Sequence, residues 1–421
     1  MKHFYLGVLL ILSHFFVLGQ ETNFSYWVVN GNSWSDPNDF LSVGIYADGN
    51  YTKIDSIQSS SVQAITSSAL GNSSESLVNF VAADTFLIKY VNEQRDTLVD
   101  NRGGKRLEYA DEHLYVGYGY GMAAEDTSYF KIFNAEDLSL IKTFPEIDKD
   151  VADIYSDGEK IYVAVSGGWG STTGEIAVVD VTTHELDTII RLDTIGNGIK
   201  GFHLSEGYIH AICSGSSFII NLKTSDLSYT IDTISGSLGF GTKSYTSEGG
   251  RLISNQAFIS LNGNTALYNF ATDSIEDSAY IAHTFSGSIN YQNSDDEVQQ
   301  ILGTFTDWFS YGRAVLYEDK DSIAGFEVEI SPEGVAVNSQ TANVGVEEIK
   351  TAQISFYPNP ATTHINIESP FEQVAYIYNA VGQTQMVLNL FQGNNIINLK
   401  TLDSGLYFIT LGNESRKLII E

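Results

Sequence analysis

The chain has 421 residues, and its 52 acidic and 22 basic side chains give a net charge of −30. This charge excludes a nucleic-acid-binding role, because such proteins need a basic surface. The chain contains 37 glycines, 24 tyrosines and 23 phenylalanines but only six prolines, and beyond its N-terminus it has no sustained helical stripe of apolar residues. This composition predicts an all-β protein, and its length predicts more than one domain.

Residues 1–19 predict a secretory signal peptide. Lys2 and His3 precede the apolar run Phe4–Leu18, which is too short to span a membrane. Val17 and Gly19 suit the small-residue positions of a cleavage site after Gly19. We therefore expect an exported protein with no transmembrane segment once the signal is removed.

Residues 25–338 repeat a pattern of four short strands separated by Gly-, Asp- and Asn-rich turns. The clearest copies are residues 105–144, 151–192 and 199–234. The second strand of each unit gives anchors about 45 residues apart, namely Trp27, Leu77, Leu114, Ile161, Ile209, Leu252 and Val298. Seven such units predict a seven-bladed β-propeller in which each blade is one four-stranded sheet.

The ends of this array predict how its ring closes. The first unit begins at its second strand, residues 25–29, and residues 334–338 form a spare strand after the last unit. A propeller must close its ring, because an open sheet edge invites aggregation. We therefore expect residues 334–338 to supply the inner strand of the first blade.

The repeat also resembles a known family. The stretches VVDVTTHELDTII and IFNAEDLSLIKTF are similar to repeats of the YVTN-type surface-layer propellers, including those common among secreted proteins of the Bacteroidetes. The resemblance covers residues 25–340 and rests on the shape of the repeat, since the Tyr-Val-Thr-Asn core itself is absent. It implies a propeller displayed outside the cell.

A second module follows the polar linker 339–353. Residues 354–421 alternate short strands with Gly and Asn turns, which predicts a small Ig-like β-sandwich. Proline removes an N–H donor, so the Pro-Asn-Pro segment at its start belongs at an edge or an entrance of the sheet.

This module closely resembles the Por-type C-terminal sorting domain of the type IX secretion system. The matching motifs contain Pro358, Asn359, Pro360, Gly382, Gly405 and Lys417. The resemblance implies recognition by the type IX machinery, passage across the outer membrane, removal of the tail, and release or anchoring at the cell surface.

The repeat register places two sets of loops on one face of the propeller, because successive strands alternate in direction. Loops between second and third strands carry Trp34, Tyr118, Tyr120, Trp169 and Trp308. The segments that enter the inner strands carry Arg102, Lys105, Arg106, Lys200 and Lys243. Aromatic rings beside cations suit an anionic or planar ligand. The alternative is that the rings pack between blades and the cations pair with local acids.

Motifs for catalysis or metal binding are weak. His184 begins a zincin-like stretch that lacks a second histidine, and Ser310 has Trp308 where the first glycine of a nucleophile elbow should be. Cys213 is the only cysteine, and its apolar strand favours a buried hydrophobe over a catalytic thiol. Calcium is weakly indicated at residues 36–39 and 293–297, where ordinary turns are favoured. We predict no catalytic residues, no resident cofactor and no defined metal site.

Three classes of function stay open. The favoured one is a secreted or cell-surface binding module for an unidentified ligand or protein. The second is a propeller enzyme, lactonase- or lyase-like, with His and carboxylate groups at the channel mouth. The third is a purely structural surface protein.

Overall fold

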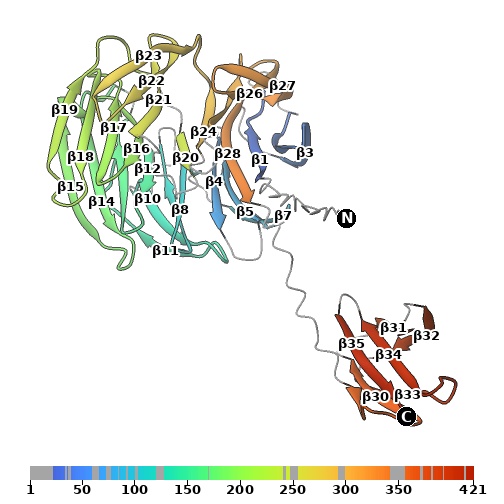
Figure 1. Cartoon of the computed structure of the whole chain (residues 1–421). Helices are drawn as coiled ribbons and strands as arrows, with labels where there is room; N and C mark the ends of the chain where they lie inside the picture. The colour runs from blue at the N-terminus through green and yellow to red at the C-terminus, as the bar shows by residue number, and fades with distance from the viewer. Residues whose placement is uncertain are drawn as a thin grey trace, which may run out of the picture. The chain divides into compact units, whose positions relative to one another are not determined.

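We analysed a computed structural model (Figure 1), which describes residues 22–33, 36, 39–58, 66–72, 77–83, 85–91, 93–99, 103–119, 128–168, 170–239, 243–246, 255–292, 299–341, 356–369, 373–380, 383–391, 393–411 and 414–421. The chain divides into two compact units, one formed by Asn23–Gln340 and the other containing Thr341–Glu421. The described residues contain no α-helix, only a 3-10 turn at Thr194–Gly196. The predicted all-β class, a propeller followed by a sandwich, is confirmed.

The described strands of the first unit form seven sheets, which we number in chain order. The first sheet has the order β28 (Pro332–Thr341), β1 (Thr22–Asn30), β2 (Leu41–Ala47) and β3 (Asn50–Ile57). The second contains β4 (Thr66–Asn72), β5 (Leu77–Ala83), β6 (Phe86–Val91) and β7 (Gln94–Val99). The third contains β8 (Arg106–Ala110), β9 (His113–Gly117), β10 (Phe130–Asn134) and β11 (Leu140–Thr143).

The remaining four sheets continue along the chain. The fourth contains β12 (Val151–Ser156), β13 (Lys160–Val165), β14 (Gly174–Asp180) and β15 (Leu186–Asp193). The fifth contains β16 (Ile199–Ser205), β17 (Tyr208–Cys213), β18 (Phe218–Lys223) and β19 (Tyr229–Thr233). The sixth contains β21 (Gln256–Leu261), β22 (Asn264–Asn269) and β23 (Ser274–Ile281). The seventh has the order β20 (Lys243–Thr246), β24 (Gly287–Gln292), β25 (Gln299–Phe305), β26 (Tyr311–Glu318) and β27 (Asp321–Ile330).

Burial along each sheet explains why its middle strands are apolar at nearly every position. In β13, the residues Ile161–Val165 are all buried, whereas the outermost strand of the fifth sheet, β19, is mostly exposed. A middle strand has a neighbouring sheet against each of its faces, so both faces need apolar side chains. The outermost strand borders solvent and tolerates polar residues.

The hydrophobic cores lie between successive sheets and close a ring. One core joins the fourth and fifth sheets through residues such as Tyr162 and Phe202, and similar cores join the other consecutive pairs. The last core packs Tyr26 and Val28 of β1 against Leu302 of the seventh sheet. Because strand side chains alternate, Trp27 of the same strand faces the second sheet. β1 therefore contributes side chains to the cores on both sides of the first sheet.

The structure confirms the predicted pairing of the last strand with the first sheet and corrects its length. β28 lies beside β1 as the inner strand (Figure 1). It extends to Thr341, so residues 339–341, which we expected in the linker, belong to the strand. Among the described inner strands, β4, β8, β12 and β16 contact one another in chain order. They surround the centre of the unit.

The sixth unit of the repeat departs from the predicted register. Its second strand is β21, which begins at Gln256, and the predicted anchor Leu252 lies outside the described residues. Before β21, Leu238 makes an isolated bridge to Leu261. β20 instead pairs in parallel with β24 of the seventh sheet. The chain between the fifth and sixth sheets thus contributes an extra strand on the inner side of the seventh.

The second unit is a sandwich of two sheets. The smaller sheet contains β29 (Phe356–Tyr357), β30 (His364–Ser369) and β33 (Gly393–Asn398). The larger has the order β32 (Thr384–Leu390), β31 (Gln373–Asn379), β34 (Gly405–Leu411) and β35 (Glu414–Ile420). Ile365 and Ile367 of the smaller sheet pack with Ile377, Ile409 and Leu418 of the larger one in a single core. Residues 342–355, which include most of the predicted linker, lie outside the described residues.

Candidate functional site

The inner strands of the propeller begin on the same face as the loop between β25 and β26, as the register predicts. Trp308 in that loop donates its indole N–H to Oε1 of Glu333, at a distance of 3.1 Å. Glu333 is the second residue of the inner strand β28. We call this side the Trp308 face; it contains the loop Thr306–Ser310 and the first residues of β8, β12, β16 and β28.

The Trp308 loop is held by its own side chains. Oδ1 of Asp307 accepts hydrogen bonds from the backbone N–H groups of Phe309 and Ser310, each at 2.8 Å. These bonds, with those from the Ser310 hydroxyl, lower the pKa of Asp307. Oγ1 of Thr306 accepts the N–H of Trp308, whose φ of 64° lies in the left-handed region. This turn keeps Trp308, Phe309 and Tyr311 at the surface, where the residues are 45%, 61% and 62% exposed.

Charged side chains of the inner strands lie below this loop. Burial raises the pKa of Glu333. The hydrogen bonds from Trp308 and Ser331, and the positive charges of Arg106 and Lys105, oppose this rise. The pKa of Arg106 is lowered by burial, which the charges of Asp153 and Glu333 oppose. Groups from the first, third and fourth sheets therefore share one electrostatic environment at the centre of the ring.

Backbone bulges link neighbouring inner strands at this level. The register of β12 shifts at Ala152, and that of β16 shifts at Lys200. Such bulges turn a carbonyl or a side chain out of the ladder. Nε of Arg106 donates to the carbonyl of Ala152 at 2.5 Å, and Oδ2 of Asp153 accepts the N–H of Phe202 at 2.9 Å. The third, fourth and fifth sheets are therefore joined by side-chain-to-backbone bonds.

Three of the predicted ligand-binding residues have surroundings that differ from those the prediction assumed. Tyr118 is fully buried in the core between the second and third sheets, so its ring is not presented to a ligand. Lys243 begins β20, the extra strand of the seventh sheet, and therefore does not share the register of Lys200. The guanidinium of Arg106 donates hydrogen bonds to the backbone carbonyls of Ala152 and Lys105.

Other predicted residues remain expectations. Lys200 is partly buried in the bulge of β16, and burial lowers its pKa. Trp34, Tyr120, Trp169 and Arg102 lie outside the described residues. Of the predicted aromatic residues that are described, Trp308 is exposed at the face and Tyr118 is not.

Sequence reasoning missed Phe309, Tyr311, Glu333 and Asp153. Phe309 directly follows Trp308 and Tyr311 lies two residues further on, and three aromatic residues within four positions would have been a detectable signal. Glu333 and Asp153 are two of 52 acidic residues spread along the chain, so neither stands out in the sequence. Their partners are distant in sequence, so the pairing itself left no local signal.

The structure describes one of the two calcium candidates in part, and it describes the single cysteine. Within the part of the chain that is described, no group of three or more His, Cys, Asp or Glu side chains is placed to hold a metal ion. In the first calcium candidate, Oδ2 of Asp39 accepts the N–H of Ser33, while residues 293–297 lie outside the described residues. Cys213 is buried, and burial raises the pKa of its thiol to about 12. This favours the buried-hydrophobe interpretation.

In the second unit, the Pro-Asn-Pro segment is bound to the C-terminal strand. Nδ2 of Asn359 donates to the carbonyl of Lys417 at 2.7 Å, and its Oδ1 accepts the N–H of Ile419 at 2.9 Å. Ala361 then continues as a parallel bridge to Ile420. Pro358 and Pro360 have no N–H groups, so the side-chain amide of Asn359 supplies the pairing that the prolines cannot.

Of the other sorting-motif residues, two lie in strands of the larger sheet and one lies outside the described residues. Gly405, expected in a turn, is the first residue of β34 and pairs with Ile420. Lys417 is exposed on β35, and Gly382 lies outside the described residues. Motifs that lie far apart in the sequence thus meet along β34, β35 and the Asn359 segment.

Comparison with known families gives the second unit an identity. Residues 355–421 match the family described as "Secretion system C-terminal sorting domain". Beta-agarase A of Zobellia galactanivorans is 35% identical over 68 residues, which are 15% of this chain and 13% of that protein. Because the chain spans so little of this curated relative, the activity of the agarase is not carried over.

Solved structures resemble the chain only distantly. BamB of Moraxella catarrhalis has a TM-score of 0.45 at 8% identity and covers 81% of this chain and 88% of its own. PorZ of Porphyromonas gingivalis, described as a surface component of the type IX secretion system, has a TM-score of 0.43 at 10% identity, over 94% of this chain and 58% of its own. The extracellular domain of BT4673 from B. thetaiotaomicron gives 0.44 at 9%, over 94% and 57%.

The sorting domain locates the protein. We detect no helix in the described residues with the length and apolar character of a membrane span. The predicted type IX sorting domain is present, and domains of this family mark proteins that this secretion system exports. The chain is therefore a type IX secretion cargo that reaches the cell surface or the extracellular space.

Proposed function

We propose that this chain is a surface binding module: a seven-bladed propeller that binds a ring-bearing ligand on its Trp308 face and is delivered by its sorting domain. The observation that carries the proposal is the rigid loop that exposes Trp308, Phe309 and Tyr311 beside Glu333. Soluble proteins seldom hold several large aromatic side chains at the surface without a partner. The seven described sheets and their closed set of cores support the blade number.

The chemistry of the loop indicates the class of ligand. An exposed indole offers a flat apolar surface for stacking, and a neighbouring carboxylate accepts hydrogen bonds from ligand hydroxyl or N–H groups. A sugar ring or another planar group with hydroxyls fits both features. Lys105, next to Arg106 at the start of β8, supplies positive charge near Glu333, which also suits a ligand with an acidic substituent.

Binding is favoured over catalysis because the central charged groups serve the fold. Asp153 accepts a backbone N–H of the next sheet, and Arg106 donates to two backbone carbonyls. A general acid or base needs a side chain that is directed at the substrate. These two groups are instead directed at the protein's own backbone.

The proposal is tested by screening the full chain on an array of glycans with neutral and acidic sugars, followed by titration of each hit. Replacing Trp308 with Ala should weaken the hit by more than about tenfold, or about 1.4 kcal/mol. The matched control is Tyr229→Ala, which removes another exposed aromatic from the outermost strand of the fifth sheet. Equal affinities of the two variants would place the binding site elsewhere, and an array without hits would remove the glycan assignment.

A further inference from the structure

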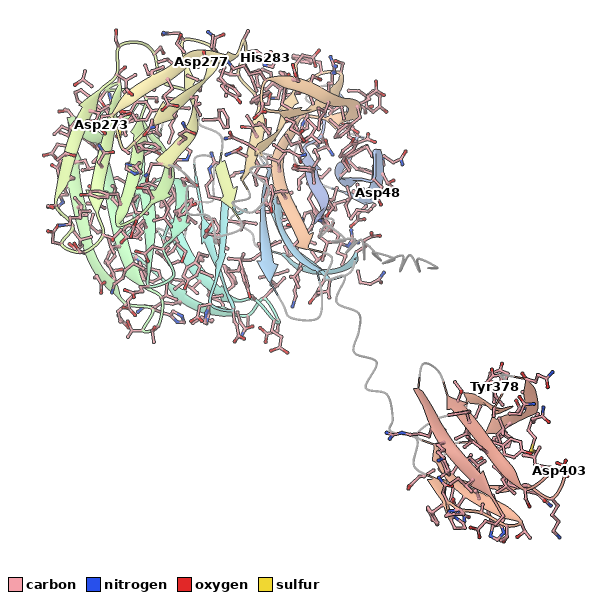
Figure 2. The ribbon with its side chains drawn as sticks, viewed as in Figure 1. Asp48, Asp273, Asp277, His283, Tyr378 and Asp403 are labelled. Carbon is pink, nitrogen blue, oxygen red and sulfur yellow. The ribbon has the colours of Figure 1, made fainter. Side chains whose placement is uncertain are left out.

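The two outer faces of the sorting domain differ in character. On the smaller sheet, β30 and β33 present His364, Glu368, Asn394 and Asn398 at exposed positions, with Ile396 as an exposed apolar residue among them. Such a mostly polar outer face is what an antiparallel sheet needs toward water. On the outward side of the larger sheet, aromatic and aliphatic side chains from three neighbouring strands lie together, beside the polar Gln385 and Asn389 of β32. We call this surface the aromatic face; it contains Tyr376, Val387, Leu406 and Phe408, which are exposed, and Tyr378, which is partly exposed and is labelled in Figure 2.

The strand register makes the aromatic face continuous. Tyr376 lies opposite Val387 of β32, and Tyr378 lies opposite Phe408 of β34. Alternate residues of these strands, such as Ile377 and Ile409, are buried in the core, so the aromatic residues project outward. Tyr376 and Tyr378 are stacked with ring centroids 6.1 Å apart. Tyr376, Val387 and Phe408 are 38%, 60% and 38% exposed, and together they cover three neighbouring strands.

Charge is almost absent from this surface. The whole chain carries a net charge of −30, yet among the described outward positions of the four strands Lys417 is the one charged residue. It lies opposite Phe408 on β35 and is exposed. An apolar patch with few charges and several aromatic residues has the composition of the centre of a protein–protein interface.

We infer that the aromatic face is the surface by which the sorting domain docks onto a protein component of the type IX export machinery. The inference rests on the export role of this domain. The family match covers residues 355–421 and stops short of the propeller, so the partner must recognise the sorting domain by itself. That partner presents an apolar surface with a carboxylate placed to meet Lys417. The propeller of the same chain is disfavoured as the occupant, because the family is defined without it.

The experiment expresses the full chain in a bacterium with a type IX system and measures surface-exposed and periplasmic protein by immunoblot. The double variant Tyr376→Thr/Phe408→Thr replaces two aromatic residues with a good strand former. It should accumulate in the periplasm, with at least about fivefold less protein at the surface. The matched control is Ile396→Thr, because Ile396 is 69% exposed on the smaller sheet; it should be exported like the wild type. Lys417→Glu should reduce export in the same direction.

The outcomes separate the docking surface from the export role. Normal export of the double variant, with export lost when residues 356–421 are deleted, overturns the docking face and keeps the export role. Normal export of the deletion variant would remove the export role itself. If the double variant fails to fold, Val387→Thr on the edge strand β32 replaces it, and normal export of that variant also overturns the inference. A concentration-dependent dimer that the double variant abolishes, with export unchanged, would assign the face to a second copy of the chain.

Discussion

Acidification should destabilise the propeller through two buried histidines of the fifth sheet. His203 and His210 are almost completely buried. Nδ1 of His210 donates to Oδ1 of Asn221 at 2.6 Å, because the amide nitrogen of Asn221 in turn donates to Asp232. Nε2 of His210 accepts the hydroxyl of Ser205 at 2.6 Å. The ring is therefore neutral in the folded protein, and it stacks on Phe270 with centroids 3.8 Å apart.

The direction and size of the effect follow from the pKa values. Burial, together with His210, lowers the pKa of His203 to about 3. Burial also lowers the pKa of His210 to about 4, against the hydrogen bond to Asn221 and the charge of Asp232. In the unfolded chain both titrate near 6.5, so the unfolded state binds protons first as the pH falls. The contribution of the two neutral histidines to the free energy of unfolding is therefore fully present above a pH of about 6.5 and declines below it. At about 1.36 kcal/mol per pH unit for each histidine, the loss at pH 5 is about 4 kcal/mol.

The assay is urea unfolding of the full chain, followed by tryptophan fluorescence at pH 7.5, 6 and 5 and constant ionic strength. His203→Phe/His210→Gln should lose much less stability than the wild type between pH 7.5 and 5, whatever its stability at pH 7.5. His113→Gln is the control, because His113 lies on β9 of the third sheet. Parallel pH dependence of the wild type and the double variant would refute the reasoning.

Three further predictions concern the ends of the two units. Asn359→Asp removes the donor to the carbonyl of Lys417 and should lower the free energy of unfolding of the sorting domain by about 1–3 kcal/mol. Chemical denaturation followed by NMR measures this loss, with Asn389→Asp on the exposed side of β32 as the control. Equal losses of stability in the two variants would contradict the role of Asn359. Deleting residues 332–341 removes β28 and exposes the edge of β1, so light scattering should show aggregation. Deleting residues 356–421 should leave propeller melting nearly unchanged, and similar behaviour of the two deletions would mean that the boundary between the units is misplaced.

Much of the fold was predictable because its determinants are local and repeated. Alternating apolar strands and Gly- or Asp-rich turns recur in each unit, and the spare strand after the last unit indicated how the ring closes. The prediction failed where one unit breaks the pattern. β20 pairs in parallel with a strand of the seventh sheet, and such a non-local pairing leaves no period in the sequence.

The candidate site was less predictable because exposure depends on the final packing. Tyr118 and Trp308 both occupy loops between second and third strands, yet Tyr118 turns into a core and Trp308 turns out. The difference comes from Thr306 and Asp307, whose side chains fix the turn around Trp308. Pairings such as Trp308 with Glu333 and Asn359 with Lys417 join segments that only the folded chain brings together.

The intact mass of the full chain's surface form, recovered from a type IX-competent host, tests the central claim most directly. The claim is that the C-terminal unit acts as an export signal for a propeller that then functions without it. We predict a mature species that begins after Gly19 and ends near Gln353, with the propeller complete through β28. A surface species that still carries the terminal residues Arg416–Glu421 would contradict the account.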